Sequence, residues 1–178
     1  MDKDLDIQNS LSLIRDVPDY PKPGILFKDI TPLLADSDAF ALVLEHLSPL
    51  TEEIDLIAGI EARGFILASA LAAKTGKGFI PIRKKGKLPS KTYSRSYGLE
   101  YGEDNLEIHQ DAFLPGSRIL LIDDVLATGG TISAALDLIA DVGGEVPVIS
   151  VLIEIASLKG RDLINTRYQG SLEALLQV

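Results

Sequence analysis

The feature that most constrains the fold of this chain is residues 119–131, which read ILLIDDVLATGGT. The first four residues are apolar with a β-branched residue at each end, and a Pro-Gly turn signal precedes them, so we expect a buried strand. Two carboxylates, Asp123 and Asp124, follow at once, and then comes the small-residue turn 127–131. Apolar residues recur at helical spacing from there to Ile139, so the pattern predicts a strand, an acidic pair, a glycine turn and a helix.

The predicted turn has the chemistry of a phosphate site. Backbone N–H groups at such a turn and at the start of the helix have no partner within the helix, and the helix dipole adds positive character. Glycine lets an anion approach the backbone closely, and the two threonine hydroxyls add donors. The candidate phosphate-binding residues are Ala127, Thr128, Gly129, Gly130 and Thr131.

The two carboxylates suggest what else binds there. Asp123 and Asp124 suit vicinal hydroxyls of a sugar, or water on a hard cation. A phosphate at one end and a diol at the other describe a ribose 5-phosphate. In the alternative interpretation, Asp124 only caps a turn and the glycine pair is a tight connection. The sequence has no Gly-x-x-x-x-Gly-Lys-[Ser/Thr] loop, and no Gly-x-Gly-x-x-Gly follows a strand.

Composition limits the class of protein. With 178 residues and 46% hydrophobic content, we expect one globular domain over residues 1–178. A net charge of -9 disfavours nucleic acid and anionic membranes as partners. No apolar run is long enough to span a membrane, and the acidic N-terminus has no signal-peptide pattern, so we expect a cytoplasmic protein. The absence of cysteine excludes disulfides, thiolate zinc and a cysteine nucleophile.

The N-terminal part predicts two helices around an irregular segment. Residues 4–15 have helical spacing, whereas residues 17–24 contain three prolines and a glycine. The apolar stretch 25–30 then either covers a pocket or packs as a plain arm on the core; the residues alone leave both open. Asp36 or Ser37 is expected to cap a helix running to about residue 47.

A second strand, turn and helix follow at residues 55–73. Arg63 stands in the small-residue turn, where a cation beside outward N–H groups suits pyrophosphate. In the alternative interpretation, Arg63 pairs with Glu61 on the surface.

A basic run lies beyond the next predicted strand, residues 78–82. From residue 83 to 95 there are six cations and no acid. Such a run is usually a solvated face, but in an acidic protein a small polyanion is the better partner. Residues 92–110 predict a hairpin or mobile loop, and residues 146–153 a further core strand.

Five segments together resemble one enzyme family. Residues 119–131 resemble the phosphoribosyl-pyrophosphate (PRPP) motif of type I phosphoribosyltransferases. Residues 21–32 resemble the N-terminal hood of the adenine phosphoribosyltransferases, residues 59–65 their pyrophosphate loop, Leu99-Glu100-Tyr101-Gly102 their lid motif and residues 158–161 their Leu-x-Gly-Arg pattern. The resemblance covers residues 17–161; Lys28 departs from it, since some relatives have arginine there.

The resemblance implies an α/β fold: a single-domain, twisted, mainly parallel sheet flanked by helices, with a hood over about residues 1–35 and a mobile lid hairpin over about residues 90–110. It also implies a homodimer. The reaction would convert adenine and PRPP to AMP and pyrophosphate with Mg²⁺, held mainly through PRPP and water. A hypoxanthine/guanine or xanthine enzyme and a PRPP-binding regulator of the same fold are the alternatives.

The resemblance also assigns roles to residues. Glu100 would be the acid/base group that acts on the imidazole ring of the purine, Arg63 would also be catalytic, and Tyr101 would help to close the lid. The binding roles would fall to Leu26, Phe27, Lys28 and Leu158 for adenine, to Asp123 and Asp124 for ribose, and to Arg63, Arg83, Lys84 and Lys87 for pyrophosphate.

Overall fold

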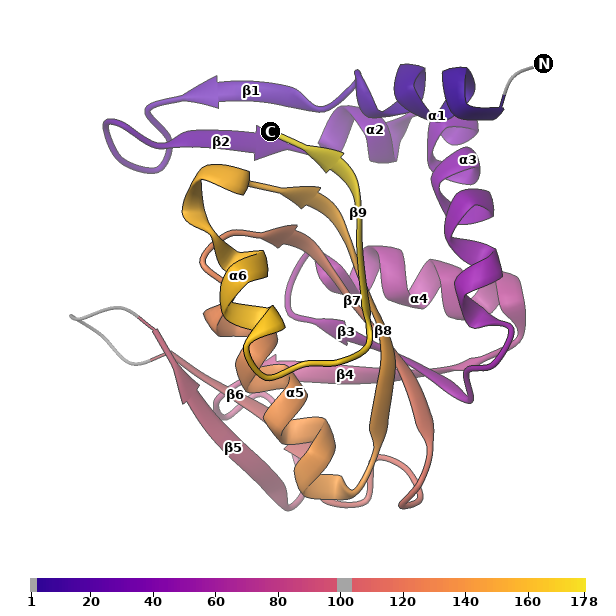
Figure 1. The fold of residues 1–178 in the computed structure, drawn as a ribbon, viewed down its shortest axis with the longest axis vertical. Coiled ribbons are helices and arrows are strands. Elements are labelled where there is room, and N and C mark those ends of the chain that lie inside the picture. The colour runs from indigo at the N-terminus through magenta and orange to yellow at the C-terminus, as the bar shows by residue number, and fades with distance from the viewer. Residues whose placement is uncertain (1–2, 99–103) are drawn as a thin grey trace. The chain divides into compact units, whose positions relative to one another are not determined.

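A computed structural model describes residues 3–98 and 104–178 (Figure 1). Contacts between Cα atoms divide the chain into two compact units, residues 1–49 and 50–178. Each unit is described by itself.

The first unit combines three helices and a hairpin. Its elements are α1 (Lys3–Leu11), β1 (Arg15–Pro18), β2 (Leu26–Asp29), α2 (Thr31–Ala35) and α3 (Ser37–Leu47), and a 3-10 turn (η1, Ser48–Thr51) follows. Most of the segment expected to be irregular, residues 19–24, is an irregular connection, and only its first two residues belong to β1, which pairs antiparallel with β2 across that connection. The predicted cap of α3 is confirmed: the Asp36 carboxylate accepts from the N–H groups of residues 38 and 39 at 3.1 and 2.9 Å.

The second unit is built on a seven-stranded sheet in the order β5-β6-β4-β3-β7-β8-β9. Its strands are β3 (Leu56–Ile60), β4 (Gly78–Lys84), β5 (Thr92–Tyr97), β6 (Asp104–His109), β7 (Arg118–Leu126), β8 (Glu145–Glu154) and β9 (Ser171–Gln177). Its helices are α4 (Gly64–Thr75), α5 (Gly130–Val142) and α6 (Gly160–Asn165), with a 3-10 turn, η2 (Ala156–Leu158), before α6. The strands β4, β3, β7, β8 and β9 are parallel, and β5 and β6 form an antiparallel edge.

The strand order creates a switch point between β3 and β7. The β3–α4–β4 connection moves to one side of the sheet, and the β7–α5–β8 and β8–α6–β9 connections move to the other. Because such crossovers are right-handed, α4 covers one face while α5 and α6 cover the opposite face. Figure 1 shows this arrangement around the central strands. In open α/β sheets the crevice at the carboxyl ends of the two strands where the order reverses is the usual ligand site.

The core explains why the 119–142 stretch folds as it does. Residues 119–122 are buried on both faces of the sheet, and α5 buries Ile132, Leu138 and Ile139 with other residues of the same face. One expectation was wrong in detail: β7 does not end at residue 122 but continues to Leu126, so the acidic pair lies within the strand. The reason is pairing, since β8 stays in register with β7 up to residue 126.

The predicted hairpin at residues 92–110 is present in the described residues as β5 and β6, which pair from Thr92 opposite His109 to Tyr97 opposite Asp104. Residues 99–103, which contain the whole Leu-Glu-Tyr-Gly motif, lie outside the described residues.

Candidate active site

The predicted phosphate and pyrophosphate loops lie at the switch point. Residues 61–63 connect β3 to α4, and residues 127–129 connect β7 to α5. Because β3 and β7 are adjacent and parallel, both loops leave the same edge of the sheet and diverge to opposite faces. The two loops therefore follow adjacent strands at the edge of the sheet where open α/β folds usually bind their ligands.

The loop after β7 has backbone N–H groups without a partner among the described residues. Ser133 is the first residue of α5 whose N–H reaches a carbonyl behind it, Gly129 O at 2.9 Å, and no bond between described residues is donated by the N–H groups of residues 127–132. Thr128 is exposed, and the predicted phosphate-binding residues apart from Gly129 are at least partly accessible. The loop thus has the open, donor-rich form that binds a phosphate.

Gly160, at the start of α6, supports this loop from behind. A Cβ at Gly160 would lie 2.2 Å from Ala127 O and 2.9 Å from Gly129 N. Gly129 has φ of +86°, and a Cβ there would lie 2.8 Å from Gly160 O. The two glycine backbones therefore pack directly on each other. Sequence reasoning noted the Leu-x-Gly-Arg pattern but missed this role of its glycine.

The acidic pair is buried and joined to the pyrophosphate loop. Asp123 and Asp124 are 8% and 7% exposed, and Asp123 Oδ1 accepts from the N–H of Asp124 at 2.9 Å. Arg63 Nη2 lies 2.5 Å from Asp124 Oδ2, so Arg63 pairs with Asp124 rather than with Glu61. Burial raises the pKa of both carboxyls; the charge of Asp124 raises the pKa of Asp123 further, whereas Arg63 opposes the rise at Asp124.

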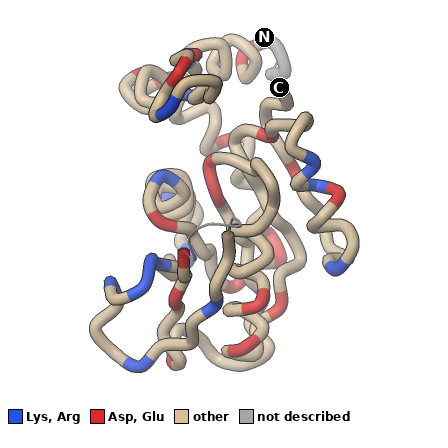
Figure 2. Tube along the Cα trace, turned by 90° about the vertical axis from the view of Figure 1, so that its left-hand side faces the viewer, with Lys and Arg blue, Asp and Glu red and all other residues tan. Residues whose placement is uncertain are grey.

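The other predicted pyrophosphate residues lie beside the same loop. Arg83 Nη2 donates to Glu61 Oε1 at 3.0 Å, and Lys84 Nζ pairs with Asp104 at 3.2 Å. Lys87 is exposed, and its charge helps to lower the pKa of Glu61, although the hydrogen bond from Arg83 is the largest cause. Figure 2 shows the Lys and Arg positions of this part of the chain in blue.

Tyr97 is a polar residue at the site that sequence reasoning missed. It ends β5, and its hydroxyl donates to Asp104 Oδ2 at 3.3 Å. Burial raises the pKa of Tyr97 to about 12, Asp104 and Asp123 contribute, and a hydrogen bond with Thr131 acts in the opposite direction. The phenol therefore stays protonated next to the phosphate loop.

The predicted adenine-binding residues fall in both units. In the first unit the Phe27 ring meets Tyr20 edge-on at 5.1 Å between centroids, Leu26 is exposed, and Lys28 Nζ pairs with Asp16 at 2.6 Å. In the second unit Leu158 is exposed in η2, just before Gly160. The predicted acid/base residue Glu100 and the lid residue Tyr101 lie outside the described residues.

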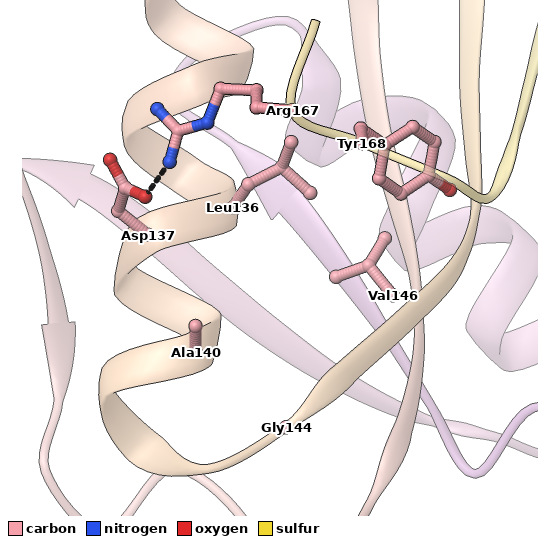
Figure 3. A pocket seen from close by; sticks show the side chains of 7 residues that line it. All are labelled: Leu136, Asp137, Ala140, Gly144, Val146, Arg167 and Tyr168. Atoms are coloured by element: carbon pink, nitrogen blue, oxygen red, sulfur yellow. Dashed lines mark hydrogen bonds and ion pairs between the residues drawn. The ribbon is translucent and has the colours of Figure 1, made fainter. Parts of the chain in front are cut away.

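A cavity of about 220 Å³ lies elsewhere, at the opposite end of α5 (Figure 3). Its lining is Leu136, Asp137, Ala140, Gly144, Val146, Arg167 and Tyr168. Arg167 and Asp137 form an ion pair at this cavity, and no predicted site residue contributes to it.

An ion pair with a buried carboxylate holds the segment that carries Gly160. Glu154, at the end of β8, is 4% exposed and accepts from Nε and Nη2 of Arg161, the latter at 2.6 Å; Arg161 Nη1 also donates to Leu172 O. Replacing Arg161 would leave a buried carboxylate without its partner.

We therefore expect Arg161→Met to lower the free energy of unfolding by about 3 kcal/mol. Arg167→Met is the matched control, because the Arg167–Asp137 pair is more exposed and should be worth less than about 1 kcal/mol. Urea denaturation followed by circular dichroism measures both. Equal losses in the two variants would contradict the expectation.

Two wider features concern metals and membranes. Within the described part of the chain, His, Asp and Glu side chains do not gather in any group of three or more that could hold a metal ion. Among residues 3–98 and 104–178, no helix has the length and apolar character needed to cross a bilayer.

Comparison with known proteins agrees with this geometry. Residues 32–167 match the phosphoribosyl transferase domain family. The chain is 56% identical over 151 residues to the adenine phosphoribosyltransferase of Halothermothrix orenii, covering 84% of this chain and 89% of the relative. It is 48% identical over 168 residues to that of Cutibacterium acnes, with 94% and 95% covered.

Solved structures agree over nearly the whole chain. The adenine phosphoribosyltransferase of Rhodothermus marinus has 46% identity and a TM-score of 0.90, with 98% of this chain and 99% of that chain covered. The Saccharomyces cerevisiae enzyme, solved with adenine and an imino-altritol bisphosphate, has 33% identity and a TM-score of 0.88, with 97% and 99% covered. The predicted fold class, that of the type I phosphoribosyltransferases, is thereby confirmed.

Proposed function

Because the chain belongs to the adenine phosphoribosyltransferase family, we propose that it transfers the phosphoribosyl group of PRPP to adenine, giving AMP and pyrophosphate in purine salvage. An imidazole nitrogen of adenine forms the new bond to the anomeric carbon as the bond from that carbon to pyrophosphate breaks, and the proton of that nitrogen passes to the carboxylate of Glu100. No covalent intermediate is required, so catalysis rests on positioning and charge.

The observation that carries this proposal is the set of groups that meet at the switch point between β3 and β7. N–H groups of residues 127–132 that donate to no other described residue lie there with a buried acidic pair and an arginine from the neighbouring loop. These groups match the 5-phosphate, the ribose hydroxyls and the pyrophosphate of a single PRPP molecule.

Each of these groups has its own task. The loop after β7 holds the 5-phosphate, while Asp123 and Asp124 accept from the ribose hydroxyls and place negative charge near the cation that develops at the anomeric carbon. Arg63, with Arg83, Lys84 and Lys87 close to its loop, stabilises the departing pyrophosphate.

The base-binding roles follow the same family assignment. Phe27 stacks on the purine, Leu26 offers backbone groups to its edge, and Lys28 and Leu158 are further residues that the family assigns to the base. Backbone donors and acceptors that match the edge of adenine disfavour a purine with a different edge, because these backbone groups would then be left without hydrogen-bond partners.

We propose that Mg²⁺ is required and that the protein acts as a homodimer in the cytoplasm. The ion is expected to neutralise pyrophosphate charge, held by PRPP oxygens and water as is usual for Mg²⁺. The buried pair of Asp123 and Asp124 supports the proposed requirement for Mg²⁺, since carboxylates suit the water shell of a hard cation.

A base panel tests the reaction. With PRPP, Mg²⁺ and adenine we expect AMP and pyrophosphate in equal amounts, and with hypoxanthine, guanine or xanthine at most about 1% of that rate, because mismatched polar edges cost several kcal/mol. Chromatography of nucleotides and a coupled pyrophosphate assay measure this. Faster turnover of an oxopurine would support the alternative enzymes, and PRPP binding without turnover of any base would support a regulator.

Glu100→Gln tests the proposed acid/base residue. A general acid or base contributes about 10² or more to the rate, so we expect kcat to fall by about 10² while the KM for PRPP changes little. Glu103→Gln, three residues on, is the matched control. Steady-state kinetics decides, and a wild-type kcat in Glu100→Gln would remove this residue from the mechanism.

A further inference from the structure

Glu61 lies at the centre of a group of contacts that joins the pyrophosphate loop to the basic segment after β4. Its side chain is 17% exposed and belongs to the turn that carries Arg63. Oε2 accepts from Arg83 Nε at 3.2 Å and from the N–H of Lys84 at 2.9 Å, and Oε1 accepts from Arg83 Nη2 at 3.0 Å. One carboxylate therefore holds two consecutive residues of the neighbouring strand.

Arg83 passes this contact on to the basic segment. Its remaining nitrogen, Nη1, donates to the carbonyl of Lys87 at 3.0 Å, so every nitrogen of the guanidinium has a partner. Its Cζ lies 5.9 Å from the centroid of the Phe65 ring, in the first turn of α4. A planar guanidinium held at its edge and its face has little freedom to rearrange.

We propose that Glu61 is a positioning residue for pyrophosphate: through Arg83 it fixes the turn at Lys84–Lys87 beside the Arg63 loop, so that cations from two separate loops face one anion. This inference rests on the proposed function. Without Glu61, five basic residues between positions 83 and 91 would repel one another and the Arg63 loop, and each would have to be ordered when the anion binds.

A second contact limits what Glu61 controls. Glu107, 8% exposed, accepts from the N–H of Gly86 at 3.0 Å and holds the tip of the turn. Loss of Glu61 should therefore leave β4 and the tip of the turn in place and release the chain near Lys87.

The test uses Glu61→Gln, which keeps the shape of the side chain but removes its charge. We expect pyrophosphate to bind about tenfold more weakly by calorimetry and the KM for PRPP to rise by a similar factor, with the KM for adenine within twofold. Glu53→Gln is the matched control, because Glu53 lies away from these loops and pairs with Arg118, with 3.1 Å between Nη2 and Oε2. This variant should leave the pyrophosphate affinity, the KM for PRPP and the KM for adenine unchanged.

Limited trypsin digestion provides a readout independent of activity. In Glu61→Gln, cleavage after Lys87 should be at least fivefold faster than in the wild type, and Arg83→Gln should give the same increase with no further increase in the double variant. Unchanged cleavage, or pyrophosphate binding that is unchanged or tighter, would overturn the proposal; tighter binding would mean that Glu61 only competes for the cations. A wild type that neither binds pyrophosphate nor turns over would refute the proposed function, while the digestion still reports on the contact.

Discussion

Gly160→Ala should reduce kcat/KM for PRPP by about 10³ while the protein still folds. The added Cβ would lie 2.2 Å from Ala127 O, a distance that packed atoms do not tolerate. Because the φ angle of Gly160 is not positive, alanine meets no backbone strain there and should even favour α6. The clash must therefore be relieved by moving the 127–129 backbone, whose N–H groups are the proposed phosphate donors, and losing oriented donors costs about 10²–10³ in rate.

The control for Gly160→Ala is Gly78→Ala at the start of β4. A Cβ there would lie 2.6 Å from Leu56 Cδ2, the far end of a flexible side chain. That variant should lose some stability through overpacking and keep its KM for PRPP. Steady-state kinetics with thermal melting compares the two. If Gly160→Ala kept a wild-type KM and kcat, the phosphate would not depend on this loop.

Asp124→Asn should reduce kcat/KM by about 10³, chiefly by removing the carboxylate that we propose binds the ribose hydroxyls and that pairs with Arg63. Truncating one partner of a buried charged pair costs about 2–5 kcal/mol in binding. Stability should change little. Burial raises the pKa of Asp124, so its ionised form opposes folding at pH values above the ordinary pKa, and asparagine does not carry that cost.

Kinetics and thermal melting across pH 5–8 check this expectation. Asp137→Asn is the matched control, since Asp137 pairs with Arg167 at the far cavity and should keep wild-type kinetics. A loss of activity matched by a collapse in melting temperature would assign Asp124 a structural role. Wild-type kcat/KM would remove it from the site.

The strand–loop–helix units were predictable from sequence because their signals are local. An apolar run, a glycine turn and helical spacing lie side by side in residues 119–142, and the structure has β7 and α5 there. The same holds for residues 55–75. Short elements were harder: α6 has six residues, too few for periodicity to emerge, and β1 has only four.

The contacts that organise the candidate site were not predictable from one sequence. Arg63 and Asp124 are far apart in the chain, as are Glu61 and Arg83, and both pairs meet only because β3 lies between β4 and β7. Sequence reasoning considered a pair between Arg63 and Glu61, because these residues are only two positions apart. The strand order instead provides each of them with a different partner. The packing of Gly160 on the phosphate loop likewise depends on β8 lying beside β7.

The most direct test of the central claim is to titrate the ¹⁵N-labelled protein with AMP and to follow the backbone amide signals of residues 127–132. We expect large shifts of these amides with AMP, much smaller ones with adenosine, which lacks the phosphate, and none in Gly160→Ala at the same AMP concentration. If AMP binds while the signals of these amides do not shift, the phosphate is held elsewhere and the loop after β7 is not the phosphate site.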